Sequence, residues 1–221
     1  MRGNVTIFRF DPTIDREPRY QSYSFDYQKD MTVLDVLGQI RDNQDASLGY
    51  VYCCRYKQCG ICGMMINGKP ALSCRHPAEE ELMLEPLRNF PVLKDLMIDR
   101  DEYERLRPAL RLFLEREQVA ANQMEHIDMQ VFEQFKIASR CIECYCCVSA
   151  CPVYKNNPHA FAGPAALLLE ARHFFDPRDS LSRDIILNSE GIDLCIKCGA
   201  CSKVCGVGAD PAGIIRQMTK I

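Results

Sequence analysis

Fourteen cysteines in a chain of 221 residues are the feature that most constrains this protein. They are grouped: five lie in 53–74, five in 141–151 and four in 195–205, with none between 75 and 140. Disulfides, zinc sites and iron–sulfur clusters all give rise to cysteine-rich sequences. Cysteines two or three residues apart are poor disulfide partners for one another, but they can converge on one metal centre. The grouping therefore favours metal centres.

The start of the chain has no secretory pattern. One early Arg is present, but no apolar core of signal-peptide length precedes Asp11. We therefore expect a reducing compartment, where thiols stay thiols. The longest apolar run, 160–169, contains Gly163 and Pro164 and is too short to span a bilayer. The net charge of −3 argues against a nucleic-acid partner.

The first half of the chain has the pattern of a small β-rich domain. Thr32 is a suitable N-cap with Asp35 three residues later, and an apolar stripe at i, i+3, i+4 and i+7 begins at Val33. The dipeptide Asn67-Gly68 is a strong hairpin signal. The sequence predicts one helix after Thr32 and strands at 4–10, 20–27, 63–66 and 82–84.

The second half has helical patterns. Pro164 suits the first turn of a helix, and Pro108 should end or kink the helix that starts near Asp101. We place the domain boundary at residue 98, which gives domains 1–98 and 99–221. The expected helices are 101–106, 129–139, 164–175 and 182–188.

The first cysteine group has the spacing C-x4-C-x2-C, then eleven residues, then a fourth cysteine. This is the plant-type [2Fe–2S] spacing. Gly60 and Gly63 would let the backbone pass close to the cluster, and backbone N–H groups there would bond its sulfurs. A zinc site is the alternative, although zinc more often uses C-x2-C pairs. The candidate ligands are Cys54, Cys59, Cys62 and Cys74.

The second and third groups repeat one spacing, C-x2-C-x2-C-x3-C, which is the bacterial ferredoxin run. In two-cluster ferredoxins the fourth cysteine of each run binds the other cluster. The same crossing here predicts two cubane clusters that tie distant segments together. Structural zinc rarely uses four cysteines packed so closely. The predicted sets are Cys141, Cys144, Cys147 and Cys205 for one [4Fe–4S] cluster, and Cys151, Cys195, Cys198 and Cys201 for the other.

Two cysteines, Cys53 and Cys146, are left over. Each adjoins a candidate ligand, and taking either one as the ligand fits the motif spacing less well. We interpret both as small, buried, thiol-bearing hydrophobes.

A plant-type [2Fe–2S] motif followed by a two-cluster run is a specific combination. Family-like segments surround it, including FRFDP, CGICGMMINGKPALSC, NFPVLKDLMID and CPVY…NP…GPAALLLEARHFFDPRDS. On these segments the chain resembles the iron–sulfur subunits of the succinate dehydrogenase/fumarate reductase family, on the fumarate reductase side.

The resemblance implies an α+β fold: a β-grasp [2Fe–2S] ferredoxin-like domain, then an all-α ferredoxin-like domain with two cubane-type clusters. It implies a subunit that relays electrons between an FAD flavoprotein subunit and a quinone-reactive membrane anchor, with haem b as an option on that anchor. Such a subunit lies on the cytoplasmic side of the cytoplasmic membrane, attached through its partners. We expect no catalytic residue in this chain, whose sequence has no Ser/His/Asp constellation, P-loop or GxGxxG.

The chain departs from the usual family pattern at its third group. Most members have a non-cysteine where Cys198 stands and bind [3Fe–4S] there. With Cys198 as a fourth thiolate, we predict a second [4Fe–4S] cluster. Gly206 also replaces the usual proline after Cys205, and the chain has no Trp for a quinone pocket.

Two alternatives remain at this point. One keeps the electron-transfer role but changes the partner to another flavoprotein oxidoreductase that acts on an unsaturated acid or another donor. The other is a zinc-stabilised scaffold without a redox role.

Overall fold

A computed structural model describes residues 2–116 and 126–219. The chain forms two compact units, and the segment Ile142–Ala150 from the second cysteine group packs with the first of them. The first unit is mainly β and the second is helical, which confirms the predicted α+β class. The units are Met1–Arg100 with Ile142–Ala150, and Asp101–Cys141 with Cys151–Ile221.

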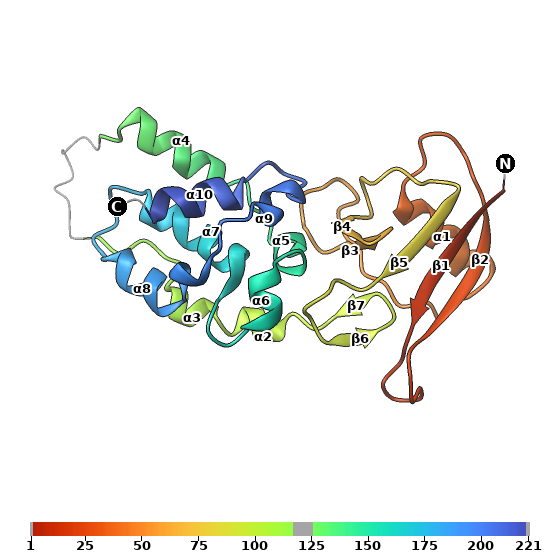
Figure 1. Ribbon diagram of the computed structural model, residues 1–221. Helices are drawn as coiled ribbons and strands as arrows, with labels where there is room; N and C mark the ends of the chain where they lie inside the picture. The colour runs from red at the N-terminus through yellow and green to blue at the C-terminus, as the bar shows by residue number, and fades with distance from the viewer. Residues whose placement is uncertain (1, 117–125, 220–221) are drawn as a thin grey trace. The chain divides into compact units, whose positions relative to one another are not determined.

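Within the described residues, the first unit contains a mixed five-stranded sheet in the order β2-β1-β5-β3-β4 (Figure 1). Strand β1 pairs antiparallel with β2 and parallel with β5, and β3 pairs antiparallel with both β5 and β4. Two short strands, β6 and β7, pair separately. The strands are β1 (Arg2–Arg9), β2 (Arg19–Asp26), β3 (Gly63–Ile66), β4 (Lys69–Leu72), β5 (Glu81–Glu85), β6 (Val92–Lys94) and β7 (Met97–Ile98).

Helix α1 (Val33–Asn43) packs its apolar face into the core of this sheet. The predicted capping box is present: Asp35 N–H donates to the Thr32 hydroxyl and Thr32 N–H donates to the Asp35 carboxylate. The four residues of the predicted stripe are fully buried, because the 3.6-residue period places them on one side. The predicted hairpin also forms, with positive φ at Asn67 and Gly68 between β3 and β4.

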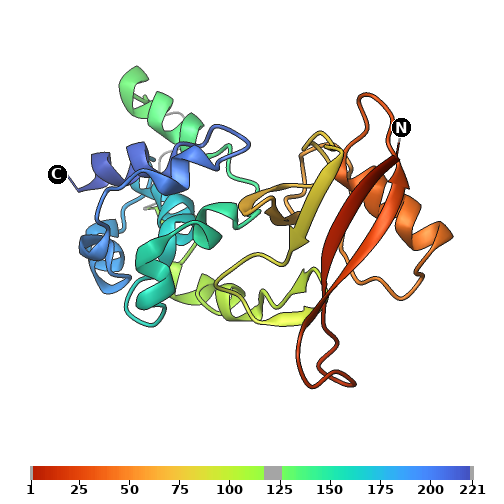
Figure 2. The same ribbon diagram turned by 45° about the vertical axis from the view of Figure 1, so that its right-hand side comes forward.

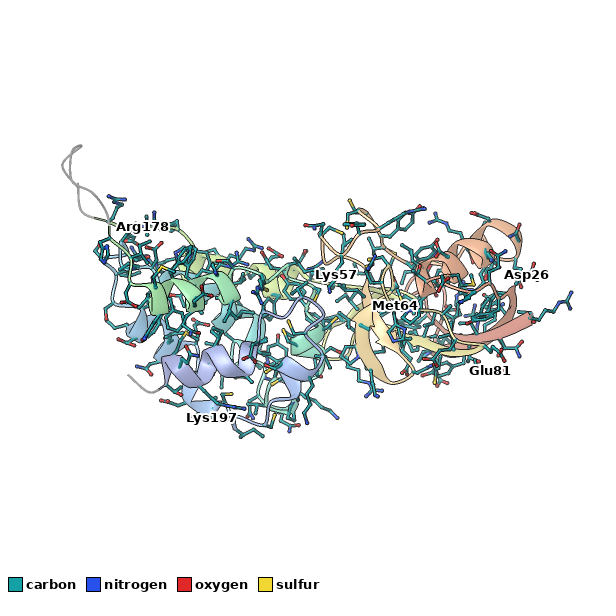
Figure 3. The ribbon with its side chains drawn as sticks, turned by 90° about the horizontal axis from the view of Figure 1, so that it is seen from above. Asp26, Lys57, Met64, Glu81, Arg178 and Lys197 are labelled. Atoms are coloured by element: carbon teal, nitrogen blue, oxygen red, sulfur yellow. The ribbon has the colours of Figure 1, made fainter. Side chains whose placement is uncertain are left out.

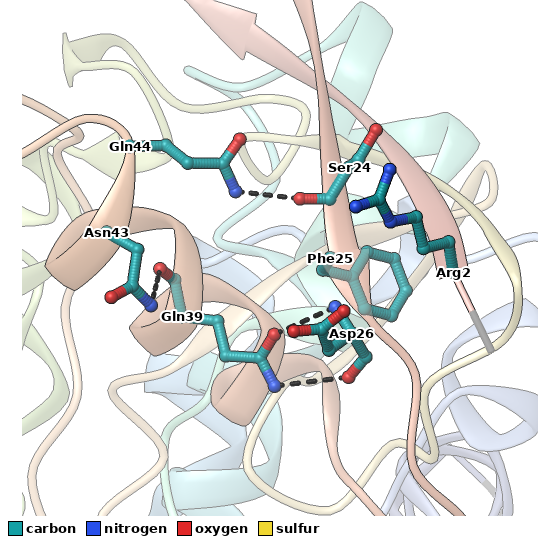
Figure 4. A pocket seen from close by; sticks show the side chains of 7 residues that line it. All are labelled: Arg2, Ser24, Phe25, Asp26, Gln39, Asn43 and Gln44. Atoms are coloured by element: carbon teal, nitrogen blue, oxygen red, sulfur yellow. Dashed lines mark hydrogen bonds between the residues drawn. The ribbon is translucent and has the colours of Figure 1, made fainter.

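Polar side chains on α1 tie the helix to β2 around a small hollow (Figure 4). Gln39 accepts from the Asp26 N–H and donates to the Asp26 carbonyl, and Gln44 donates to the Ser24 carbonyl at 2.7 Å. These bonds fix the helix along the edge strand. The lining residues are Arg2, Ser24, Phe25, Asp26, Gln39, Asn43 and Gln44.

The second unit is organised around α7, which packs against α4, α8 and α10 (Figure 2). Every residue of α7 from Gly163 to Ala171 is buried. The helices of this unit are α2 (Asp101–Glu104), α3 (Arg107–Leu110), α4 (Met129–Ala138), α6 (Pro152–Asn156), α7 (Gly163–Phe174), α8 (Arg183–Ser189), the 3₁₀ turn η1 (Ile192–Leu194), α9 (Ala200–Lys203) and α10 (Pro211–Met218). Helix α5 (Cys146–Ser149) belongs to the first unit.

The helix expected over 101–106 is interrupted. It ends at Glu104, and Pro108 lies in the first turn of the separate helix α3. Proline is tolerated there because the first turn needs no N–H from it. The helices over 129–139, 164–175 and 182–188 are confirmed to within a residue at each end. No helix among the described residues has both the length and the apolar character to cross a membrane.

Candidate iron–sulfur sites

The loop after Cys54 curls around that sulfur. The backbone N–H groups of Tyr56, Gln58 and Cys59 all donate to Cys54 Sγ, at 3.3, 3.3 and 3.4 Å. Positive φ angles at Arg55, Lys57 (labelled in Figure 3) and Gly60 produce the curl. Three converging N–H groups stabilise an anionic sulfur, so they lower the pKa of the Cys54 thiol to about 7.

The four cysteines of this group form two pairs. The Cys59 N–H donates to the Cys54 sulfur at 3.4 Å, and Cys62 and Cys74 are close enough for the charge of one to act on the other. The Cys62–Cys74 pair is buried, and burial raises the pKa of Cys62 to about 11. A [2Fe–2S] cluster takes four thiolates, and two pairs of thiols match two irons with two ligands each.

Ser73 brings the fourth cysteine back to the loop. Its N–H and its hydroxyl both donate to the Cys62 carbonyl, at 3.1 and 3.2 Å. Ser73 is fully buried at the end of the β3–β4 hairpin, so the hairpin places the next residue, Cys74, beside Cys62. This explains how a ligand twelve residues away in sequence joins the group.

Gly60 and Gly63 pack against the segment that holds Cys144. A Cβ on Gly60 would lie 2.2 Å from the Ile142 carbonyl oxygen, and one on Gly63 would lie 2.8 Å from the Cys144 carbonyl oxygen. No side chain fits at either position. The sequence predicted close approach to a cluster at these glycines; the structure also shows close approach to another stretch of backbone.

The internal repeat extends to the backbone. In the second group, Glu143 and Tyr145 have φ of 55° and 60°; at the equivalent positions of the third group, Lys197 and Gly199 have φ of 57° and 80°. A short helix then starts in each, α5 after Tyr145 and α9 after Gly199. Non-glycine residues rarely adopt this conformation. Because the two loops share it, Cys198 occupies the same place in its loop as Cys144 does in its own.

The third predicted set comes together in the second unit. Its four cysteines line one small cavity with apolar walls that include Phe161 and Ile215; Lys197, labelled in Figure 3, lies on the same loop. Burial raises the pKa of Cys201 to about 12 and also raises that of Cys151, and the nearby thiolates add to both effects. Cys198 is the exposed member of the set. The four cysteines are Cys151, Cys195, Cys198 and Cys201.

The remaining set is divided between the units. Cys144 and Cys147 belong to the first unit, and Cys141 and Cys205 to the second. In the second unit, Arg140 donates to the Gly208 carbonyl at 3.2 Å, which ties the residue before Cys141 to the turn after Cys205. The joint ligation of one cluster by these four cysteines stays a prediction.

The two leftover cysteines differ. Cys146 is 2% exposed, as expected, but the expectation that Cys53 is buried is wrong, because Cys53 is exposed in the stretch before the cluster loop. Across the described residues, no three His, Cys, Asp or Glu side chains gather as they would around a single metal ion.

The chain matches two families of iron–sulfur domains. Residues 4–105 match the 2Fe-2S iron-sulfur cluster binding domain and residues 137–209 match the 4Fe-4S dicluster domain. The chain is 34% identical to the fumarate reductase iron-sulfur subunit of Haemophilus influenzae, over 97% of this chain and 90% of that one. It belongs to the succinate dehydrogenase/fumarate reductase iron–sulfur subunit family. Members of this family are subunits of oxidoreductase complexes.

The chain is also similar to one longer protein and to one solved structure. It is 37% identical to a subunit of the fumarate reductase (CoM/CoB) of Methanothermobacter marburgensis, over 91% of this chain but only 40% of that longer protein. The fold is that of a chain in the Mycobacterium smegmatis Sdh1 complex in the apo form, with a TM-score of 0.87, 23% identity, and coverage of 99% and 94% of the two chains.

Sequence reasoning missed the residues that support the Cys144 loop. Arg100 lies over the Tyr145 ring, 4.3 Å from its centroid, and donates to the Glu143 carbonyl. The Tyr145 ring also stacks on Phe90, with the ring centroids 5.7 Å apart. These contacts hold Tyr145 at positive φ, and the glycine at the equivalent position 199 was the signal that could have revealed this conformation.

Proposed function

We propose that this chain is the electron-transfer subunit of a fumarate reductase or succinate dehydrogenase complex. The observation that carries the proposal is the cavity lined by Cys151, Cys195, Cys198 and Cys201, because the ferredoxin crossing predicted that set from two distant segments. The family membership and the thiol pairs of the first group support it.

When bound, iron–sulfur clusters supply reversible one-electron transfer. The chain's own groups hold the clusters and set their potentials. Cys54, Cys59, Cys62 and Cys74 would hold [2Fe–2S], with the N–H groups of the Cys54 loop neutralising part of the thiolate charge. Cys141, Cys144, Cys147 and Cys205 would hold the first [4Fe–4S].

The third site would take a second [4Fe–4S] rather than [3Fe–4S]. Its loop repeats the backbone of the Cys144 loop, so Cys198 is available as a fourth thiolate. Phe161 and Ile215 in the cavity wall exclude water from one side of the site. An apolar wall without water disfavours added negative charge on the cluster and so affects the reduction potential of the cluster.

The partners follow from the same proposal. An FAD flavoprotein subunit would exchange electrons at one end of the relay, and a quinone-reactive anchor, with or without haem b, at the other. The chain would then be peripheral to the cytoplasmic face of the cytoplasmic membrane. Its clusters move electrons, and the bond chemistry belongs to the flavoprotein.

A second candidate keeps the relay and changes the donor. The 37% identity to a fumarate reductase named for CoM/CoB, of which this chain spans 40%, supports a flavoprotein that works with a donor other than a quinol. The missing tryptophan at the family's quinone pocket points the same way.

The complex isolated through a tag on this chain tests both candidates. Under anaerobic conditions, succinate, menaquinol and CoM plus CoB are added separately, and electron paramagnetic resonance records which of them reduces the clusters. Reduction by succinate and menaquinol supports the first candidate, and reduction by CoM plus CoB supports the second. A complex without FAD or iron would overturn both.

A further inference from the structure

Arg216 of helix α10 reaches the loop that carries Cys198. Its Nη2 atom donates a hydrogen bond to the Lys197 carbonyl at 3.4 Å. A Cβ on Gly199, the residue after Cys198, would lie 3.7 Å from the same Nη2 atom. The guanidinium therefore lies beside the backbone on both sides of Cys198, which is a member of the third predicted cluster set.

Helix α10 is fixed against this site by its apolar residues. Ala212 and Ile215 line the same cavity as the four cysteines of the set, and both are buried. Met218 is buried as well, whereas Arg216 is exposed. Because Arg216 directly follows Ile215, the packing of the helix decides where the exposed guanidinium can lie.

The second cysteine group has the same arrangement. Glu143 is equivalent to Lys197, since each residue directly precedes the second cysteine of its run. Arg100 donates to the Glu143 carbonyl, as Arg216 does to the Lys197 carbonyl. The two arginines lie outside the repeated runs, one before the second group and one after the third. An arginine on this carbonyl therefore accompanies the shared loop conformation.

A fixed positive charge beside a cluster changes the redox balance of that cluster. Adding one electron makes the cluster and its thiolates more negative. A guanidinium stays charged at every working pH, so its attraction stabilises the reduced state more than the oxidised state. An exposed side chain that moved freely in water would act weakly. The bond to the Lys197 carbonyl holds the charge of Arg216 beside the loop.

We propose that Arg216 is a positioning residue for the Cys198 loop and that its charge raises the reduction potential of the third cluster. The inference rests on the proposed function, because it requires a cluster in that cavity. It applies to [4Fe–4S] and to [3Fe–4S] alike, since the charge acts on either type of cluster.

The test is a redox titration of the full complex, followed by electron paramagnetic resonance of its three centres. Arg216→Gln keeps an amide donor and removes the charge. It should make the third centre roughly tenfold harder to reduce, a shift of about 59 mV to lower potential for one electron. Arg216→Lys keeps the charge and should retain most of the potential. The other two centres should be unchanged in both variants.

Arg178→Gln is the matched control. It removes the same charge from the same unit, at a residue that pairs with Asp176 at 2.7 Å and lies apart from Lys197 in Figure 3. The potentials of all three centres should stay unchanged in this variant.

A further variant applies if the complex with Arg216→Gln does not assemble. Arg216→His is charged at about pH 5.5 and neutral at about pH 8, so one protein provides both states. The potential of its third centre should then fall between these two pH values by more than it does in the unaltered complex. An equal fall in the two complexes would overturn the inference.

The outcomes separate the inference from the proposed function. An unchanged potential in Arg216→Gln with all three centres present overturns the inference alone. Equal shifts in Arg216→Gln and Arg216→Lys also overturn it, because they would show that the charge has no part. An equal shift in Arg178→Gln would do the same. Absence of every cluster from the unaltered complex overturns the proposed function together with the inference.

Discussion

Arg9 and Asp95 form a buried ion pair, with Arg9 Nε 3.0 Å from Asp95 Oδ1 and the residues 86 positions apart. The same carboxylate accepts from the N–H groups of Phe10 and Gly49, at 2.9 and 2.8 Å. Arg9 also pairs with Asp45. One carboxylate thus fastens the end of β1 to the segment that leads into the first cysteine group.

Asp95→Ala should destabilise the protein by about 3–5 kcal/mol, because it leaves a buried guanidinium, the buried Gly49 N–H and the part-buried Phe10 N–H short of a partner. The measurement is the urea midpoint of the cluster-containing protein. Asp15→Ala breaks the exposed pair with Arg19 and should cost less than about 1 kcal/mol. Equal losses in the two variants would contradict this account.

Cys54→Ser and Cys53→Ser form a matched pair of neighbours. Cys54→Ser should abolish the [2Fe–2S] signal, because the loop N–H groups converge on that sulfur. Cys53→Ser should leave the signal intact, since Cys53 is an exposed bystander. Visible circular dichroism of the purified chain measures the cluster directly. The reverse pattern would mean that Cys53, and not Cys54, is the first ligand of the motif.

Cys198→Ser should convert the third centre from [4Fe–4S] to [3Fe–4S] and leave the fold unchanged. Three cysteine thiolates remain at the site, and a three-iron cluster needs one thiolate ligand fewer than a four-iron cluster does. Electron paramagnetic resonance of mildly oxidised protein, purified without oxygen, should show a [3Fe–4S] signal in the variant and none in the unaltered protein. A full [3Fe–4S] signal in fresh unaltered protein would mean that Cys198 is not a ligand.

Gly60→Ala should destabilise the protein more than Gly68→Ala. Both glycines have positive φ, of 68° and 76°, and so share the backbone strain of about 1 kcal/mol. Only Gly60 adds a clash, because its Cβ would lie 2.2 Å from the Ile142 carbonyl oxygen, whereas nothing lies near that of Gly68. Thermal midpoints of the two variants measure the difference. A smaller loss at Gly60 would argue against the contact with Ile142.

Glu170 should make stability depend on pH. Burial raises its pKa to about 7, despite Arg183 at 3.1 Å. The folded state then binds more protons than the unfolded state between pH 4.5 and about 7, so the unfolding free energy falls as pH rises through that range.

Glu170→Gln should flatten this dependence and raise stability at pH 8 relative to pH 6. Urea midpoints at the two pH values measure it. Glu133→Gln, in an exposed pair with Lys136, is the control and should leave the profile unchanged. A profile that is the same with and without Glu170 would show that the carboxylate stays ionised throughout.

Local signals predicted the local elements well. The capping box at Thr32, the stripe from Val33 and the Asn67-Gly68 turn each involve neighbours in sequence, and each is present in the structure. In β1, Arg9 lies on the buried face with Val5 and Ile7, as the period of two residues requires. Nothing local identified Asp95 as its partner, since that pairing is decided by tertiary packing.

The cysteine sites were only partly predictable from the sequence. Spacing predicted Cys151 in the third set, because the crossing rule relates two runs that align, and Cys151 lines the same cavity as the other three members. The helices α5 and α9 are four residues long, too short for any periodic pattern.

Iron and acid-labile sulfide, counted per chain in protein purified without oxygen, test the central claim most directly. Three clusters of the predicted types require about ten irons and about ten sulfides. Colourless protein with about three zinc ions and no sulfide would contradict the redox account altogether.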